Sequence, residues 1–398
     1  MSKHSEIDTR MKTYYEQIPK TRLTRRTPVA IRLDGKAFHT LTRNFERPFD
    51  QVMIQSMQAT MQQLCENIQG CVLGYTQSDE ITLILVDYKK LTSSAWFDNE
   101  VQKICSVSAS MATSYFQFWM KYFSHTYIDN LERSLLKDLF NANSFEELTD
   151  DQKEKFYQLK EDSEDRGLAR LSRAYDAAHH NALFDSRCFN IPKEEVANLI
   201  YWRQQDATRN SIEMASRAYY SHKELDHVNQ NQMQEMLFQK GINWNDYPVP
   251  CKRGSCCIKE TYFVDKEGNE IDSSVCEDAT KRSRWIVDQN IPIFVGAGRK
   301  YIEDLIYIDE TPSTMRLQDI IGVINEHIKI SIVSLKGHTL EQADNIYSLS
   351  HDWDKFYVKE INSRPDETGN KSVIMIMVFP DDNQERRHKY EVLCGIPV

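Results

Sequence analysis

The order of the periodic segments is the feature that most constrains how this chain folds. The predicted elements, in chain order, are a strand over 27–35, a helix over 49–68, two strands around a polar turn within 71–87, a helix over 98–123 and a strand over 185–191. Asp98 is expected to cap the helix over 98–123. Another long helix follows the strand over 185–191, with Pro192 in its first turn. This succession is that of the ferredoxin-like, or split βαβ, arrangement, and the fold class is α+β.

This topology predicts that two distant carboxylates meet. The first and second strands run parallel, with the third antiparallel between them, so Asp34 and Asp79 reach the same edge of the sheet although 45 residues separate them. Two carboxylates at one edge repel each other unless a cation lies between them, and hard oxygen ligands suit Mg²⁺. Two such ions roughly 4 Å apart are typical of phosphoryl transfer. The carbonyl of Gly35 is a further candidate ligand, whereas Glu80 is expected to point to the opposite face from Asp79. The alternative is that Ser78, Asp79 and Glu80 only solvate a hairpin tip.

Composition and cysteine usage narrow the class of protein. The 398 residues allow two or three domains with the composition of a soluble globular protein, and we expect no membrane span and no signal or transit peptide. The nine cysteines have no framework spacing, which favours reduced thiols and a cytoplasmic protein. Cys251, Cys256 and Cys257 lie close together but lack the paired spacing of a zinc site.

Charge is unevenly distributed along the chain. The formal net charge is −10, yet residues 18–47 hold eight basic against two acidic residues. Residues 145–165 hold nine acidic residues against three lysines. A polyanionic ligand is therefore attracted to the first segment and repelled by the second, although each could also be an ordinary solvated face.

Five stretches in the same order resemble one known family, the tRNA-His guanylyltransferases. They are RLDGKAFH (32–39), TQSDE (76–80), WFDNEVQKICSVSASMATSYF (96–116), FDSRCFNIPKEEVANLIYWRQQDATRNS (184–211) and FQKGINWND…CKRGS (238–255). The resemblance covers roughly residues 5 to 300. It implies a palm like that of DNA polymerases, working in the 3′-to-5′ direction on the 5′ end of an RNA, with a monophosphate end first activated by ATP.

The resemblance also assigns site residues. It implies two Mg²⁺ ions on Asp34, Asp79 and the Gly35 carbonyl, with Glu80 as a third catalytic residue. Nucleotide contacts are implied for Arg32, Gly35, Lys36, Ala37, Phe38, His39, Arg47, Ser78 and Lys103. RNA contacts are implied for Arg209, Asn210, Lys252 and Arg253. The substrates would be ATP, GTP and other nucleoside triphosphates together with tRNA, and the assembly a homotetramer built from dimers.

Several of these residues also have ordinary structural interpretations. Arg32 and Lys103 could be surface ion-pair partners, and His39 a packed or hydrogen-bonded turn residue. Lys252 and Arg253 could belong to a simple basic loop.

The chain departs from the family in three places. Enzymes strict for tRNA-His have a His-Ile-Asn-Asn-like stretch where this chain has Thr208 followed by Arg209, Asn210 and Ser211. It therefore looks like the guanylyltransferase-like branch, whose members mostly repair 5′-truncated tRNAs with all four nucleotides. Residues 122–183 are longer than expected, and residues 310–398 have no recognised counterpart. That last segment suggests a small α+β module of unreadable function after a linker at 311–313.

These observations divide the chain into a first palm segment at 1–120, an acidic helical insertion at 121–184, the end of the palm with an RNA-binding or activation region at 185–309, and the module at 310–398. Our leading interpretation is templated 3′-to-5′ addition of nucleotides to tRNA. The alternatives are addition of a single G to tRNA-His, a nucleotide cyclase on the same palm, and a non-catalytic RNA-binding protein. The intact Asp34, Asp79 and Glu80 speak against the last of these.

Overall fold

The computed structural model describes residues 6–90, 92–161, 167–271 and 279–308, together with three strands farther along the chain. The chain divides into two compact units, Met1–Ile308 and Asp309–Val398. No helix in the described part is both long enough and apolar enough to cross a membrane.

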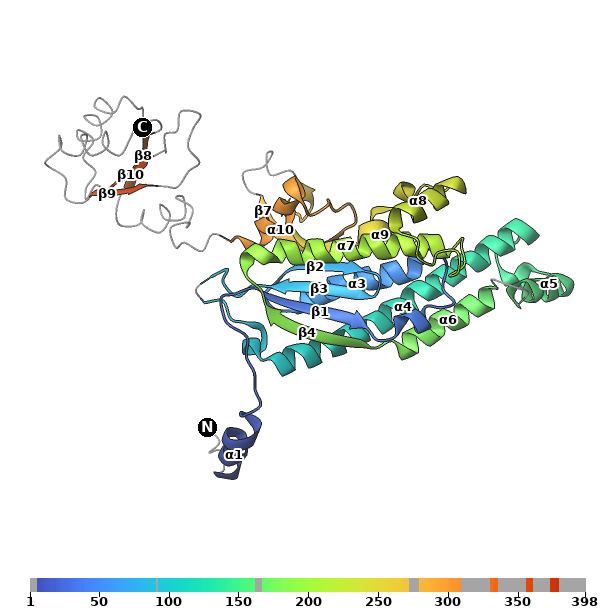
Figure 1. The fold of residues 1–398 in the computed structure, drawn as a ribbon, viewed down its shortest axis with the longest axis horizontal. Helices are drawn as coiled ribbons and strands as arrows, with labels where there is room; N and C mark the ends of the chain where they lie inside the picture. Colours follow the sequence, from blue (N-terminus) through green and yellow to red (C-terminus); the bar gives the residue numbers. More distant parts are fainter. Residues whose placement is uncertain are drawn as a thin grey trace. The chain divides into compact units, whose positions relative to one another are not determined.

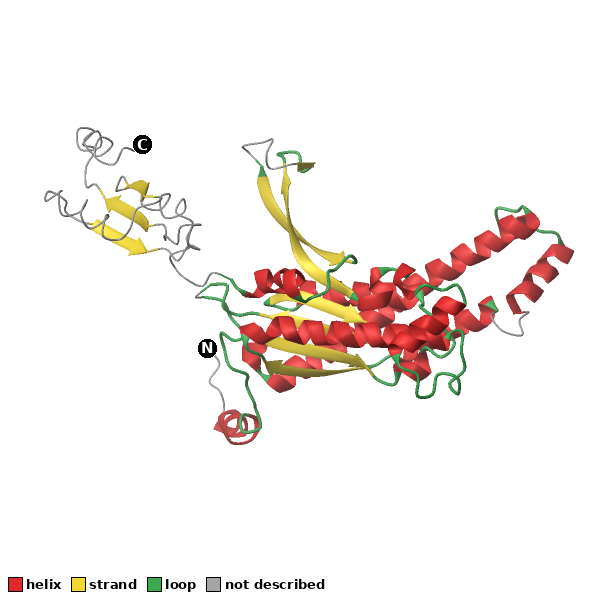
Figure 2. Ribbon diagram, turned by 45° about the horizontal axis from the view of Figure 1, so that its top comes forward, coloured by secondary structure: helices red, strands yellow, loops and turns green. Residues whose placement is uncertain are grey.

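The sheet of the first unit has the predicted topology. Its strands β1 (Val29–Gly35), β2 (Cys71–Gln77), β3 (Glu80–Leu85) and β4 (Phe184–Asn190) lie in the order β4-β1-β3-β2, and all neighbours are antiparallel. β1 and β2 are therefore parallel to each other with β3 between them, as the sequence predicts. β5 (Ser255–Val264) continues the sheet beyond β2, and β6 (Glu270–Ile271) and β7 (Thr280–Asp288) pair with β5. Figure 2 shows β5 and β7 extending as a two-stranded ribbon.

One face of the sheet packs against two helices, α3 (Gln51–Asn67) and α4 (Val101–Phe140). The apolar stripe predicted for the first helix is core: Val52, Met57, Met61, Leu64 and Ile68 are all buried. Asp50 caps α3, because its Oδ1 accepts a hydrogen bond from the Met53 backbone N–H at 2.9 Å. The alternating residues Ile31, Leu33, Ile81 and Leu83 supply the sheet's part of this core.

The long helix differs from its prediction at both ends. α4 continues to Phe140 rather than ending near residue 123, so the insertion begins as a continuation of this helix. Asp98 does not cap it. Asp98 lies in a tight turn with φ +52°, and its carboxylate is paired with Arg22 at 2.7 Å and with Arg25. α5 (Asp150–Glu161) and α6 (Leu168–Asn181) follow, and α6 returns beside α4 to the start of β4 (Figure 1).

The other face of the sheet packs against α7 (Lys193–Arg217) and α10 (Lys300–Ile306), through a second core that includes Ala30, Tyr75, Ile84 and Ile200. The remaining helices are α1 (Glu6–Met11), the single turn α2 (Phe38–Leu41), α8 (Gln230–Gln239) and α9 (Val249–Arg253). Because α7 crosses this face, the even-numbered residues of β1 point toward it.

The second unit contains an antiparallel sheet of β8 (Ile330–Leu335), β9 (Phe356–Glu360) and β10 (Val373–Val378), in the order β8-β10-β9. All three strands lie within residues 310–398, where the sequence suggests a small α+β module. The predicted linker at 311–313 lies outside the described residues.

Candidate active site

The end of β1 and the tip of the β2–β3 hairpin meet at one edge of the sheet. The Gly35 backbone N–H donates a hydrogen bond to the Asp79 carbonyl at 3.1 Å, which fixes the two segments to each other. The turn that joins β2 to β3 consists of Ser78 and Asp79, with Ser78 in the left-handed region at φ +49°. Asp34 and Asp79 are therefore neighbours, as the topology predicts.

Gly35 allows the chain to turn sharply after Asp34. A Cβ atom at this position would lie 2.4 Å from the ring of Phe38, so only glycine fits. Phe38 is buried, and its ring lies 5.3 Å from that of Phe116 and 5.2 Å from that of Phe184. The ring therefore anchors the turn in the core. At Gly35 only backbone atoms are available to contact a ligand.

The two aspartates share an unusual electrostatic environment. Burial, and after it the charge of Asp34, raises the pKa of Asp79 to about 6. Burial and then the charge of Glu80 raise the pKa of Asp34 as well. Within the described residues neither carboxylate forms an ion pair with a basic side chain. Arg32 and Arg187 act on Asp34 through space but form no ion pair with it. Hard oxygen donors without an ion-pair partner fit a hard divalent cation such as Mg²⁺.

Glu80 is the direct cross-strand partner of Asp34, but its surroundings are basic. Arg32 Nη2 lies 2.6 Å from one carboxylate oxygen of Glu80, and Arg203 Nη2 lies 2.8 Å from the other. Arg203 comes from α7, is only 4% exposed, and also contacts Asp206 Oδ2 at 2.7 Å. These contacts place Glu80 on the α7 face together with Arg32 and Asp34. Side chains alternate between the two faces only within a strand, and Asp79 lies in the turn before β3, which begins at Glu80. Strand alternation therefore does not determine where Asp79 points relative to Glu80.

A basic pocket of about 470 Å³ adjoins the turn after β1. Lys36, Ala37 and Thr40 line one side of it, and Arg170 and Arg173 of α6 line the other. In the part of the chain that the structure describes, none of these three cations forms an ion pair. A pocket with three uncompensated cations beside two carboxylates suits a bound polyphosphate.

The loop matching the KRG motif lies against the hairpin. A Cβ at Gly254 would be 2.3 Å from the carbonyl oxygen of Thr76, and Gly254 has φ +83°. The Tyr75 hydroxyl donates a hydrogen bond to the Arg253 carbonyl at 2.8 Å. Lys252 contacts the Asn245 carbonyl, and its Nζ lies 5.7 Å from the centre of the Trp244 ring. The structure thus brings this loop to the same edge as Asp79.

The other two residues predicted to contact RNA follow Arg203 along α7. Arg209 and Asn210 are exposed, and Arg209 is paired with Asp206, which in turn contacts Arg203. Thr208 uses its hydroxyl within the helix, donating to the Gln204 carbonyl at 3.0 Å.

Three residues predicted to contact the nucleotide are not connected to Asp34, Asp79 or Glu80 by a hydrogen bond or ion pair among the described residues. Lys103 is near the start of α4, where the Val101 carbonyl lies 3.9 Å from Cys188 Sγ, and Cys188 pairs with Ile31 in the sheet. Lys103 is therefore near the level of Ile31, in the middle of β1, with its Nζ 5.6 Å from the centre of the Phe97 ring. His39 is exposed, and exposed Arg47 donates a hydrogen bond to the Arg43 carbonyl at 3.5 Å.

Sequence reasoning missed three arginines of this region. Arg203 lies inside the matched WRQQD stretch, but its partner Glu80 is 123 positions away and no periodicity connects them. Arg170 and Arg173 are three positions apart, so they lie on one face of α6, but the path of the insertion is needed to place that face beside Lys36.

Comparisons with known proteins find relatives among the tRNA-His guanylyltransferases. Residues 8–192 match the family model described as tRNAHis guanylyltransferase. The structures of a bacterial tRNA(HIS) guanylyltransferase (Thg1)-like protein in complex with ATP and with GTP are both 35% identical to this chain, with TM-scores of 0.53 and 0.52. Each match covers 76% of this chain and 100% of the bacterial protein. A probable tRNA(His) guanylyltransferase of Homo sapiens is 34% identical over 98 residues, which is 24% of this chain and 31% of the human protein.

Proposed function

Because the chain belongs to the tRNA-His guanylyltransferase family and is a nucleotidyltransferase of that family, we propose that it extends the 5′ end of tRNA by template-directed 3′-to-5′ addition of nucleotides. The observation that carries this proposal is the meeting of Asp34 and Asp79, without basic partners in the described part, beside a pocket lined by cations. The likeness to the bacterial Thg1-like protein supports the polymerase branch of the family.

The acidic edge would hold the divalent cations. Asp34, Asp79 and the Gly35 carbonyl are the proposed Mg²⁺ ligands. When bound, Mg²⁺ supplies a more acidic attacking hydroxyl and neutralises charge on the reacting phosphates. The protein's own contribution is to hold the two carboxylates together through the Gly35–Asp79 backbone hydrogen bond.

The cations around this edge would bind phosphates. Lys36, Arg170 and Arg173 face one pocket, and a triphosphate is the ligand whose charge they match. Lys36 and Ala37 of the 35–39 turn line the same pocket, exposed His39 belongs to this turn, and exposed Ser78 lies at the hairpin tip. We propose that these residues and exposed Arg47 also contact the nucleotide. Arg32 and Arg203 hold Glu80 in one orientation, so Glu80 acts here as a positioning residue.

The RNA would approach from the side of the hairpin, where the loop with Lys252 and Arg253 and the exposed part of α7 with Arg209 and Asn210 provide cations and amides. Lys103 lies near Phe97 at the start of α4. We propose that any phosphate it contacts is bound by another subunit of the tetramer that the family resemblance implies.

The second candidate function is addition of a single G to tRNA-His after activation with ATP. Thr208 favours templated addition instead, because its hydroxyl is already bonded to the Gln204 carbonyl and a dedicated histidine is missing there.

The two candidates are separated by a direct assay. Purified protein, Mg²⁺, ATP and labelled nucleoside triphosphates are incubated with tRNA-His lacking its extra G, and in parallel with another tRNA lacking its first 5′ nucleotide. Efficient extension of the truncated tRNA supports repair. Extension of tRNA-His alone, by one G, would overturn the proposal in favour of the second candidate.

A further inference from the structure

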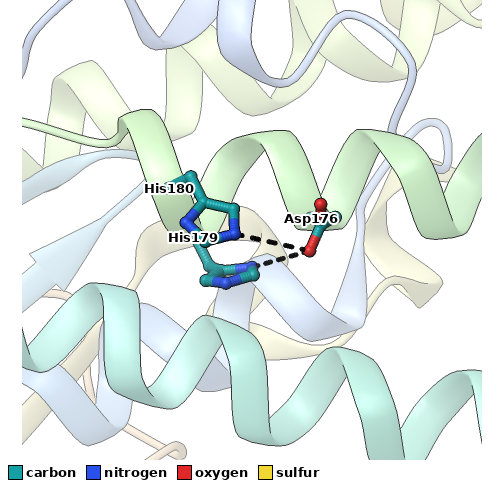
Figure 3. A group of neighbouring side chains, drawn as sticks. All are labelled: Asp176, His179 and His180. Carbon is teal, nitrogen blue, oxygen red and sulfur yellow. Dashed lines mark ion pairs between the residues drawn. The ribbon is translucent and has the colours of Figure 1, made fainter.

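A second cluster of ligand-type side chains lies on α6, away from the palm carboxylates. Asp176, His179 and His180 occupy one turn of this helix, and their side chains converge (Figure 3). Residues three and four positions apart in a helix lie on the same face, so this spacing brings the carboxylate of Asp176 over both imidazoles.

The distances in this cluster match a single bound ion. Asp176 Oδ1 is 3.5 Å from His179 Nδ1 and 3.7 Å from His180 Nε2, and the three donor atoms lie within 4.8 Å of one another. Bonds of about 2.0–2.2 Å to one metal ion place two donor atoms about 3 to 4 Å apart. The two carboxylate–imidazole distances already fall in this range.

The burial of His179 is the second observation that points to a ligand. This side chain is only 8% exposed, and its Nδ1 atom is buried without a hydrogen-bond partner. A buried imidazole nitrogen that makes no hydrogen bond is costly. This nitrogen faces the Asp176 carboxylate, so an ion between the two would satisfy both groups.

The neighbouring helix provides further donors. A pocket of about 360 Å³ separates α6 from α4, and it is lined by His179 and Asp176 on one side and by His125 and Asp129 on the other. Arg173 also lines this pocket, and Lys121 lies near His179, so cations partly oppose the two carboxylates. The two histidines therefore have to provide most of the affinity, which favours a metal that prefers nitrogen ligands.

We propose that Asp176, His179 and His180 bind one divalent transition-metal ion of the zinc class. Imidazole suits Zn²⁺, Co²⁺ and Ni²⁺, whereas Mg²⁺ prefers oxygen ligands, so the ion differs in class from the one that suits the palm. Water, or His125 from α4, completes the coordination. With His125 as the fourth ligand, the ion links α6 to α4 just before α6 leads into β4, and α6 is the helix that presents Arg170 and Arg173 to the basic pocket.

The test uses the full chain, reduced, with millimolar Mg²⁺ present to occupy the palm. Co²⁺ is titrated by calorimetry and by visible absorption, because nitrogen and oxygen coordination gives weak visible bands without the intense near-ultraviolet bands of cysteine thiolates. We expect one ion per chain with the nitrogen–oxygen spectrum, and a rise in melting temperature when the ion is bound.

Two variants make the result decisive. His180→Ala removes an exposed ligand without disturbing the core, and it should weaken binding at least about tenfold. His227→Ala is the matched control, because exposed His227 lies 3.7 Å from a single carboxylate, Asp226, and should leave binding unchanged. An absence of Co²⁺ binding, thiolate bands, or equal binding by His180→Ala and the parent protein would overturn the proposal.

Discussion

Asp34 and Glu80 lie directly opposite each other across β1 and β3, yet only Glu80 has basic partners. Arg32 and Arg203 each approach one oxygen of the Glu80 carboxylate, whereas Asp34 faces the turn that holds Asp79. The sheet edge thus separates one compensated carboxylate from two uncompensated ones. On this basis we propose that Asp34 and Asp79 bind the cations and that Glu80 is a positioning residue.

Replacing either uncompensated aspartate should abolish nucleotide addition. Asp34→Ala and Asp79→Ala remove a proposed cation ligand, and we expect a loss of at least about 10³-fold in the rate of addition with the fold intact by circular dichroism. Asp185→Asn is the control, because this exposed residue is the β4 neighbour of Asp34 and is paired with Arg187. Near-normal addition by either alanine variant would refute the assignment.

Arg203 should matter for both stability and activity. It is buried against Glu80 and Asp206, so Arg203→Ala removes one of the two basic partners of each carboxylate and should cost about 1–3 kcal/mol in the free energy of unfolding, with Arg32 still paired to Glu80 and Arg209 to Asp206. Arg203→Lys keeps the charge but loses the forked contact, so we expect a lower kcat with little change in KM. A double-mutant cycle with Glu80→Gln measures the coupling, and additive effects on kcat would show that Arg203 does not act through Glu80.

The raised pKa of Asp79 predicts an unusual dependence of stability on pH. Its pKa is about 6 in the folded protein and 3.8 in the unfolded chain, so the folded state binds the proton more tightly. Without divalent cations, stability therefore falls as the pH rises from about 4 to 6. Asp79→Asn should remove this loss, which we expect to be about 1 to 2 kcal/mol after allowing for partial exposure.

Urea unfolding in chelator at pH values of about 4.5 and 7 measures this difference. Wild-type and Asp79→Asn proteins whose stabilities change in parallel between these pH values would contradict it. In the presence of Mg²⁺ the difference should shrink, because the cation competes with the proton for the same carboxylate.

The basic pocket makes a prediction about substrate binding. Arg170→Ala and Arg173→Ala should each raise the KM for nucleoside triphosphates, by roughly tenfold, because each removes a charged contact to phosphate. Arg133→Ala is the control, since this exposed arginine of α4 does not line the pocket. Unchanged KM in both pocket variants would place the triphosphate elsewhere.

The sequence predicts the order of the strands and the meeting of Asp34 and Asp79 because strand order and the hairpin are local patterns with a long-range consequence. It does not predict Arg203 or the arginines of α6, since their roles depend on where α7 and the insertion cross the sheet. Asp98 illustrates the same limit. Its position before a helix is typical of a cap, but Arg22 and Arg25 compete successfully for its carboxylate.

The proposed function requires that a template chooses the added nucleotide. The most direct measurement uses a tRNA lacking its first 5′ nucleotide, prepared in four versions that differ only in the opposing nucleotide of the acceptor stem, with all four triphosphates present. In each version the protein should add the base that forms a Watson–Crick pair with the opposing nucleotide. Addition of G in every version, or only opposite C, would contradict it.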